Sequence, residues 1–208
     1  MLTRLLAASL ALVSVPAIPQ ATPMTPAKLI KLLPRSEPLQ PDVVFQDYPL
    51  VKRVDCIEGR GSGFRVGENH MFTAAHVASL TNCMIEQMPI SVTEQDDLND
   101  FASFDVADGV PHGLAIDCDG YKPSHWYWAI GYAMGRNTQT AVQVYATIFF
   151  DPDGQRILIG HHAFVPGMSG GPVIDPDTGK VVGIVNAYDP ANGISISSEL
   201  KFTSACGA

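Results

Sequence analysis

Two short segments of this chain carry the residue types needed for acyl transfer. Ser169 lies within the glycine-rich run Gly167–Pro172, and His76 lies in the much earlier segment Thr73–Val77. A serine hydroxyl is a weak nucleophile near neutral pH. It needs a base to take its proton, and it needs hydrogen-bond donors to hold the oxyanion that forms on the attacked carbonyl. His76 can be this base, and the glycines around Ser169 allow a tight turn whose N–H groups converge beside the hydroxyl.

The two motifs together resemble the chymotrypsin/trypsin-like serine proteases, in particular the short bacterial and viral members. The order His, Asp, Ser along the chain is the order of that family, and it differs from the orders of subtilisin and of the α/β-hydrolases. The resemblance covers residues 51–196 and includes the strand Gly61–Phe64 that precedes the histidine. Both motifs in this order and setting indicate the family far more strongly than either motif alone.

The resemblance implies an all-β fold with two six-stranded antiparallel β-barrels and an active site in the cleft between them. It implies a serine endopeptidase that hydrolyses peptide bonds through an acyl-enzyme, with Ser169 as nucleophile and His76 as general base. The backbone N–H groups of Gly167 and Ser169 would form the oxyanion hole. The expected partner is a protein or peptide substrate, and we expect no cofactor.

A carboxylate must hold the imidazole in the right tautomer, and the sequence offers two candidates. Asp100 is followed by a continuous run of strand-forming residues, which fits the family pattern of an aspartate at the start of a strand. Asp105 begins a similar run, but Asp108 and Gly109 interrupt it. We therefore expect Asp100 to be the orienting residue, with Asp105 as the alternative, and we place the run 94–97 in a loop.

The resemblance also places a substrate pocket. Ala163 would lie at its base, and Val185, Asn186 and Ala187 would line one wall. No acidic residue stands where it could receive a Lys or Arg side chain, so we expect cleavage after small or medium apolar residues.

The residue before the nucleophile is Met168. Many trypsin-like enzymes have an aspartate there, which pairs with a new N-terminus created by activation cleavage. Met168 cannot form such an ion pair, so other contacts must hold the site in its active shape.

The composition is that of a globular protein: 46% of the 208 residues are hydrophobic and 16% are charged. A formal net charge of −8 argues against non-specific binding to nucleic acid, which depends on Lys and Arg. The pair His161-His162 has no further His or Cys at ligand spacing, so we expect no metal site. The sequence does not predict an oligomeric state.

The N-terminus has the pattern of an export signal. Arg4 is followed by the apolar stretch Leu5–Val15, and small residues then suit cleavage after Ala17 or Ala21. We expect a signal peptide over residues 1–17, extending to 21 with the later cleavage site. The mature protein would be secreted or periplasmic, with no membrane span left after cleavage.

Export would permit disulfides, and there are four cysteines. The family often has a bridge around its histidine segment, so the resemblance favours Cys56–Cys83, and Cys118–Cys206 would then be the second pair. Four free thiols are the alternative, if the protein stays in a reducing compartment.

The remaining organisation follows from prolines and short apolar runs. Six prolines in residues 18–42 predict an arm or propeptide without a sheet or a long helix. The protease domain would span residues 43–208, with one barrel over about 43–110 and the other over about 120–200, and we expect no regulatory domain after Ala208.

Ala74–Leu80 is expected to form a short helical turn. The expected strands are Val51–Cys56, Gly61–Val66, Met71–Ala74, Cys83–Ile85, Ser91–Thr93, Phe101–Val106, Trp128–Tyr132, Ala141–Phe150, Arg156–His161, Pro172–Ile174 and Val181–Ala187.

Two other functions are compatible with the same residues. A catalytically silent homologue could act as a binding module, although the complete Ser, His and Asp set argues for an enzyme. An esterase would use the same acyl-transfer machinery without a protein substrate.

Overall fold

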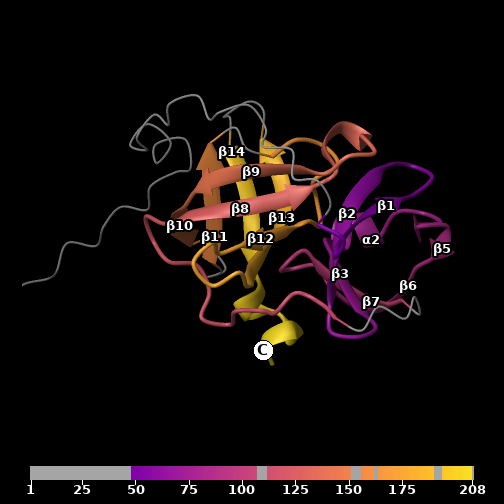
Figure 1. Ribbon diagram of the computed structural model, residues 1–208, viewed down its shortest axis with the longest axis horizontal. Helices are drawn as coiled ribbons and strands as arrows, with labels where there is room; N and C mark the ends of the chain where they lie inside the picture. The colour runs from indigo at the N-terminus through magenta and orange to yellow at the C-terminus, as the bar shows by residue number, and fades with distance from the viewer. Residues whose placement is uncertain (1–47, 107–111, 151–155, 162–163, 190–193, 208) are drawn as a thin grey trace, which may run out of the picture. The chain divides into compact units, whose positions relative to one another are not determined.

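The structure is a computed structural model that describes residues 48–106, 112–150, 156–161, 164–189 and 194–207 (Figure 1). The expected signal peptide, the proline-rich arm and Ala163 lie outside these residues. Within the described part of the chain, no helix has the length and apolar character needed to cross a membrane.

The described N-terminal half forms one antiparallel sheet in the order β5-β4-β1-β2-β3-β7-β6. Phe64 in β2 lies opposite Val51 on one side and Phe72 on the other. The Phe72 ring makes edge contacts with the rings of both Phe64 and Phe101, and all three side chains are buried. The strands are β1 (Val51–Asp55), β2 (Arg60–Val66), β3 (His70–Thr73), β4 (Met84–Ile85), β5 (Met88–Pro89), β6 (Ser91–Asp96) and β7 (Phe101–Asp105).

The C-terminal half forms a second antiparallel sheet in the order β10-β11-β14-β13-β12-β8-β9. Figure 1 colours its strands from salmon to yellow, whereas those of the first sheet run from indigo to magenta. Its strands are β8 (Trp126–Gly131), β9 (Thr140–Tyr145), β10 (Thr147–Phe150), β11 (Arg156–His161), β12 (Pro172–Ile174), β13 (Val181–Asp189) and β14 (Ile194–Glu199).

These two curled sheets confirm the all-β, chymotrypsin-like fold class, with a small correction to the strand count. Each sheet has seven strands in the described residues, where six were expected. The expected strand 141–150 is two strands, because the chain leaves β8 and joins β11 at Ala146, whose N–H donates to the His125 carbonyl (2.9 Å).

Strand β14 was missed because its inward-facing residues are serines rather than apolar residues. Ser195 and Ser197 are fully buried, and the Ser197 hydroxyl donates to the Ile184 carbonyl at 2.6 Å. Residues 194–197 do alternate apolar and polar side chains, but here the polar ones are buried, so the rule that the apolar residues of a strand face inward does not identify it.

The expected helical turn is shorter than 74–80. Ala74 is extended, the helix α2 covers Ala75–Ala78, and the Ser79 hydroxyl donates to the Ala75 carbonyl (2.9 Å). Three 3₁₀ turns complete the described elements: η1 (Ala133–Gly135), η2 (Leu200–Phe202) and η3 (Ser204–Cys206).

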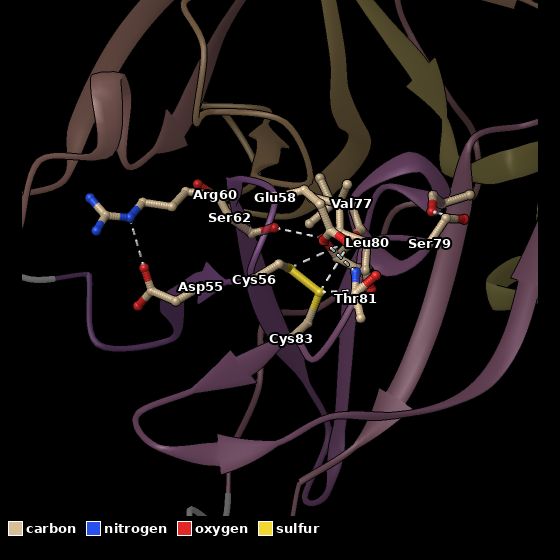
Figure 2. Close-up of a disulfide and its surroundings, with 12 residues drawn as sticks. Asp55, Cys56, Glu58, Arg60, Ser62, Val77, Ser79, Leu80, Thr81 and Cys83 are labelled. Atoms are coloured by element: carbon tan, nitrogen blue, oxygen red, sulfur yellow. Dashed lines mark hydrogen bonds and ion pairs between the residues drawn. A yellow bond between two sulfur atoms is a disulfide. The ribbon is translucent and has the colours of Figure 1, made fainter.

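Two disulfides join segments that are distant in the sequence: Cys56–Cys83 and Cys118–Cys206. Figure 2 shows the first of them beside Val77 and Leu80, and Cys83 Sγ lies 3.3 Å from the Leu80 carbonyl oxygen. This bridge closes the segment that contains α2 and thereby constrains the helix that carries His76.

Candidate active site

His76 in α2 and Asp100 in the turn before β7 meet beside the first sheet. His76 Nδ1 lies 2.8 Å from one oxygen of the Asp100 carboxylate and 3.0 Å from the other. The His76 backbone N–H also donates to this carboxylate, at 2.9 Å. Because a carboxylate accepts hydrogen bonds, Nδ1 carries the imidazole proton and Nε2 is left as the acceptor.

A tight turn brings Asp100 into this position. The Asp96 carboxylate accepts the N–H groups of Leu98 (3.0 Å) and Asn99 (3.1 Å), and Asp100 then takes a left-handed φ of 48°. Pairing of Thr73 with Ala102 in the adjacent strands holds α2 beside the turn. Asp96 ends β6 rather than lying in the expected loop.

The alternative carboxylate, Asp105, lies at the other end of β7. It pairs with His70 Nδ1 at 2.7 Å, and both side chains are more than half exposed. The structure thus places Asp100, and not Asp105, against His76.

Ser169 lies in the turn before β12, and the backbone of Ser169 and Gly170 packs against β2 and the segment that precedes His76. The Ser169 carbonyl accepts the Ser62 N–H at 2.7 Å, and the Gly170 N–H donates to the Val185 carbonyl at 2.7 Å. Gly170 has a φ of 85°, and a β-carbon there would overlap the Ser62 carbonyl oxygen and lie 2.9 Å from the Ala74 nitrogen. Glycine is therefore required for the close approach of the two segments.

The Ser169 hydroxyl donates to the Asn186 carbonyl at 2.9 Å. Among the described residues it has no hydrogen bond to His76. A β-bulge at Asn186 interrupts the pairing of β13 with β14 and leaves this carbonyl available as an acceptor.

The expected oxyanion-hole donors are oriented by their neighbours. The Pro166 carbonyl accepts the Met134 N–H at 2.6 Å. The C=O and N–H of a trans peptide point in opposite directions, so the N–H of Gly167 points away from Met134. Neither this N–H nor that of Ser169 donates to a described residue, which leaves both available to a ligand oxygen.

The expected wall of the pocket is described. Val185 is buried and its N–H donates to the Gly171 carbonyl (2.9 Å), whereas Ala187 is exposed. Asn186 is half-buried, and its side-chain amide donates to the Ser198 hydroxyl at 2.6 Å. Ala163, which was expected at the base of the pocket, lies outside the described residues.

A separate polar cluster lies at the turn after β12. His125 Nε2 is 3.1 Å from Asp175 and 3.8 Å from Asp177, and Lys122 Nζ is 2.7 Å from Asp175. Burial raises the pKa of the Asp175 carboxyl, but the hydrogen bonds from Lys122, Asp177 and His125 outweigh it and lower this pKa overall. The Lys122 ammonium already supplies the positive charge that this carboxylate needs.

Comparison with known proteins identifies the family. The family model described as a trypsin-like peptidase domain matches residues 61–184, which is more than half of the chain. The chain belongs to the trypsin-like peptidases. A comparison with curated proteins finds no match.

Solved structures of serine proteases have the same fold as this trypsin-like peptidase. The inactive form of the Rv3671c protease is 24% identical, with a TM-score of 0.62, and the alignment covers 77% of this chain and 90% of that one. The active form of that protease, from M. tuberculosis, is 22% identical, with a TM-score of 0.60 and coverage of 96% and 93%. The HtrA-type protease AlgW with a tripeptide is 20% identical, with a TM-score of 0.64 and coverage of 76% and 58%.

Ser62 was expected only as part of a strand, but it lies beside Ser169. It is fully buried and contacts the backbone on both sides of Met168. The signal in the sequence was a hydroxyl residue between two glycines, Gly61 and Gly63.

Proposed function

We propose that this trypsin-like peptidase is a serine endopeptidase with the triad Ser169, His76 and Asp100. The observation that carries the proposal is the contact of His76 Nδ1 with both oxygens of the Asp100 carboxylate, at 2.8 and 3.0 Å. This contact fixes the tautomer in which Nε2 accepts a proton, and it stabilises the imidazolium that forms when it does.

The reaction begins when the Ser169 hydroxyl turns from the Asn186 carbonyl toward His76 Nε2. Nε2 takes the hydroxyl proton while Oγ attacks the peptide carbonyl, and the N–H groups of Gly167 and Ser169 hold the oxyanion. The imidazolium then gives its proton to the leaving amine, which departs and leaves an acyl-enzyme. Water, deprotonated by His76, releases the acid and restores the serine.

The substrate preference and the location are part of the same proposal. The enzyme cleaves after small or medium apolar residues, because none of Val185, Asn186 and Ala187 supplies a negative charge for a Lys or Arg side chain of the substrate. It is exported, and its two disulfides are compatible with an oxidising compartment. Expression of the full chain in a bacterium, followed by fractionation and N-terminal sequencing, should give a periplasmic or secreted protein that begins at Ile18 or Thr22.

Labelling with a fluorophosphonate tests the nucleophile. The wild-type protein should be labelled and Ser169→Ala should not, because the change removes Oγ and little volume. Ser91→Ala removes an exposed hydroxyl at the start of β6 and should be labelled like the wild type. Labelling of Ser169→Ala would refute the assignment.

The second candidate is a catalytically silent homologue that binds peptides. It is favoured by one observation, the Ser169 hydroxyl bond to the Asn186 carbonyl in place of a bond to His76. Catalytic hydrogen bonds often form only when substrate is bound, which favours the enzyme. A folded wild-type protein that binds an apolar peptide but takes up no fluorophosphonate would establish the silent homologue.

A further inference from the structure

One buried hydroxyl connects three segments of the chain beside the nucleophile. Ser62 in β2 is 0% exposed. Its hydroxyl donates to the Gly167 carbonyl at 2.8 Å and accepts the Tyr132 N–H at 2.9 Å. A hydroxyl has one proton and two lone pairs, so it can make both bonds at once. It thereby joins β2 to the loop before Ser169 and to the end of β8.

The backbone of Ser62 holds the other side of the same loop. Its N–H donates to the Ser169 carbonyl at 2.7 Å, and its own carbonyl accepts the Thr73 hydroxyl at 2.7 Å. Ser62 therefore fixes the carbonyl groups of Gly167 and Ser169, one on each side of Met168. These peptide units neighbour the two N–H groups that would form the oxyanion hole.

The surroundings leave room for this contact only because Gly131 has no side chain. A β-carbon on Gly131 would lie 2.9 Å from Ser62 Oγ and 2.9 Å from the Met168 Cα atom. The Met168 side chain itself is 0% exposed and packs in an apolar cluster with Tyr127 and Val182. No charge at residue 168 can therefore hold the loop.

We infer that Ser62 is a positioning residue of the oxyanion hole, and that its hydroxyl holds the Gly167 carbonyl in place of a buried ion pair at residue 168. The inference rests on the proposed function for its catalytic consequence. Ser62 is fully buried and has no hydrogen bond to His76 among the described contacts; it acts through its bond to the Gly167 carbonyl.

Removal of the hydroxyl gives a defined consequence. In Ser62→Ala the Gly167 carbonyl and the Tyr132 N–H lose their shared partner. Buried polar groups without partners are unfavourable, so we expect the Gly167–Met168 peptide, whose N–H donates to the Val165 carbonyl (3.1 Å), to shift toward another donor and to displace the adjacent Gly167 N–H. Displacement of about 1 Å near a reacting group costs about 100-fold in rate, so we expect a loss of about 10- to 100-fold in kcat. KM should stay within about threefold, because an oxyanion donor acts on the transition state.

The test compares two serine-to-alanine changes in the first sheet. Ser103→Ala is the matched control: Ser103 is 7% exposed, and its hydroxyl bonds the Thr93 hydroxyl (3.0 Å) without contacting the loop. Ser62→Thr keeps a hydroxyl and should restore most of kcat. Each variant is assayed for thermal unfolding, for kcat and KM on one apolar peptide, and for amide hydrogen exchange in the segment 164–171.

The inference predicts that Ser62→Ala alone loses kcat and exchanges faster in segment 164–171. Equal kcat in Ser62→Ala and Ser103→Ala, or unchanged exchange in that segment, would overturn it. A wild-type protein without peptidase activity would refute the proposed function, whereas the exchange measurement would still decide whether Ser62 holds the loop. If Ser62→Ala does not fold, the Ser62→Thr variant, which keeps the hydroxyl, decides. Wild-type kcat and wild-type exchange in this variant support the role of the hydroxyl. A loss of kcat with unchanged exchange in segment 164–171 overturns it.

Discussion

Both oxygens of the Asp100 carboxylate face His76 Nδ1, and one of them also accepts the His76 backbone N–H. The side chain of Asp100 is 22% exposed, whereas that of His76 is 50% exposed. The carboxylate is thus fixed to the backbone of the helix whose imidazole it orients, and the rest of the ring remains accessible from solvent.

The first prediction concerns this carboxylate. Asp100→Asn should lower kcat by about 10⁴-fold, because an amide at this position stabilises the wrong imidazole tautomer. Asp105→Asn is the matched control, since Asp105 pairs with the exposed His70. Steady-state kinetics on one peptide checks both, and a greater loss in Asp105→Asn would reverse the choice of carboxylate.

The strands around the site could be predicted from the sequence because they depend on local patterns. The apolar run after Asp100 correctly predicted β7, and the glycines around Ser169 correctly predicted the tight turn before β12. The helix that carries His76 was found, although it ends at Ala78 rather than Leu80.

The contacts that complete the site depend on residues far apart in the chain. Ser62 and Gly167 are separated by 105 positions, and no local pattern indicates that a hydroxyl of β2 meets that carbonyl. The bulge at Asn186, which gives the Ser169 hydroxyl an acceptor, follows from the register of β13 against β14. Registers of this kind are set by packing of the whole sheet, so the sequence alone could not supply them.

The second prediction concerns Asp175 and the pH dependence of stability. Asp175→Asn should lower the free energy of unfolding at pH 7 by about 1–3 kcal/mol, because the buried carboxylate accepts hydrogen bonds that an amide cannot all replace. The pKa of Asp175 in the folded protein lies below its ordinary value of 3.8. The ionised Asp175 therefore stabilises the folded protein at pH values above 3.8, and this stabilisation is lost as the pH falls through the lower pKa of the folded state.

Urea unfolding at several pH values measures this effect. The difference between the wild type and Asp175→Asn should narrow as the pH is lowered below about 4. Asp177→Asn alters a carboxylate that is 71% exposed and should change stability little. A difference that widens in acid would show that the sign of the pKa shift is wrong.

The third prediction compares the two disulfides. Cys118 and Cys206 are 88 positions apart, and Cys56 and Cys83 are 27 apart. A cross-link that closes a longer loop removes more entropy from the unfolded chain, about 4.6 kcal/mol for the long loop and about 3.6 kcal/mol for the short one. The double variant Cys118→Ser/Cys206→Ser should therefore be less stable to urea than Cys56→Ser/Cys83→Ser. The opposite order would mean that strain or residual structure outweighs loop length.

The last prediction concerns activation. Truncations that start at successive residues from Pro38 to Val44 should all have the same activity on one peptide substrate. An activating N-terminus needs an acidic partner for its ammonium group, because a buried charge without a partner is unfavourable by several kcal/mol. Met168 offers none, and its side chain is buried in the apolar cluster that includes Ala133 and Val173.

Met168→Asp provides the matched test. The new carboxylate would lie in the apolar cluster without a partner, so this variant should be less stable than the wild type at pH 7, and the deficit should shrink in acid as the carboxyl takes up a proton. If neutral contacts hold the loop, the activity of the Met168→Asp variant should also be the same whichever residue the truncated chain starts at. Activity confined to a single start residue in the wild-type background would contradict this interpretation and would point to another acidic residue as the partner of the N-terminus.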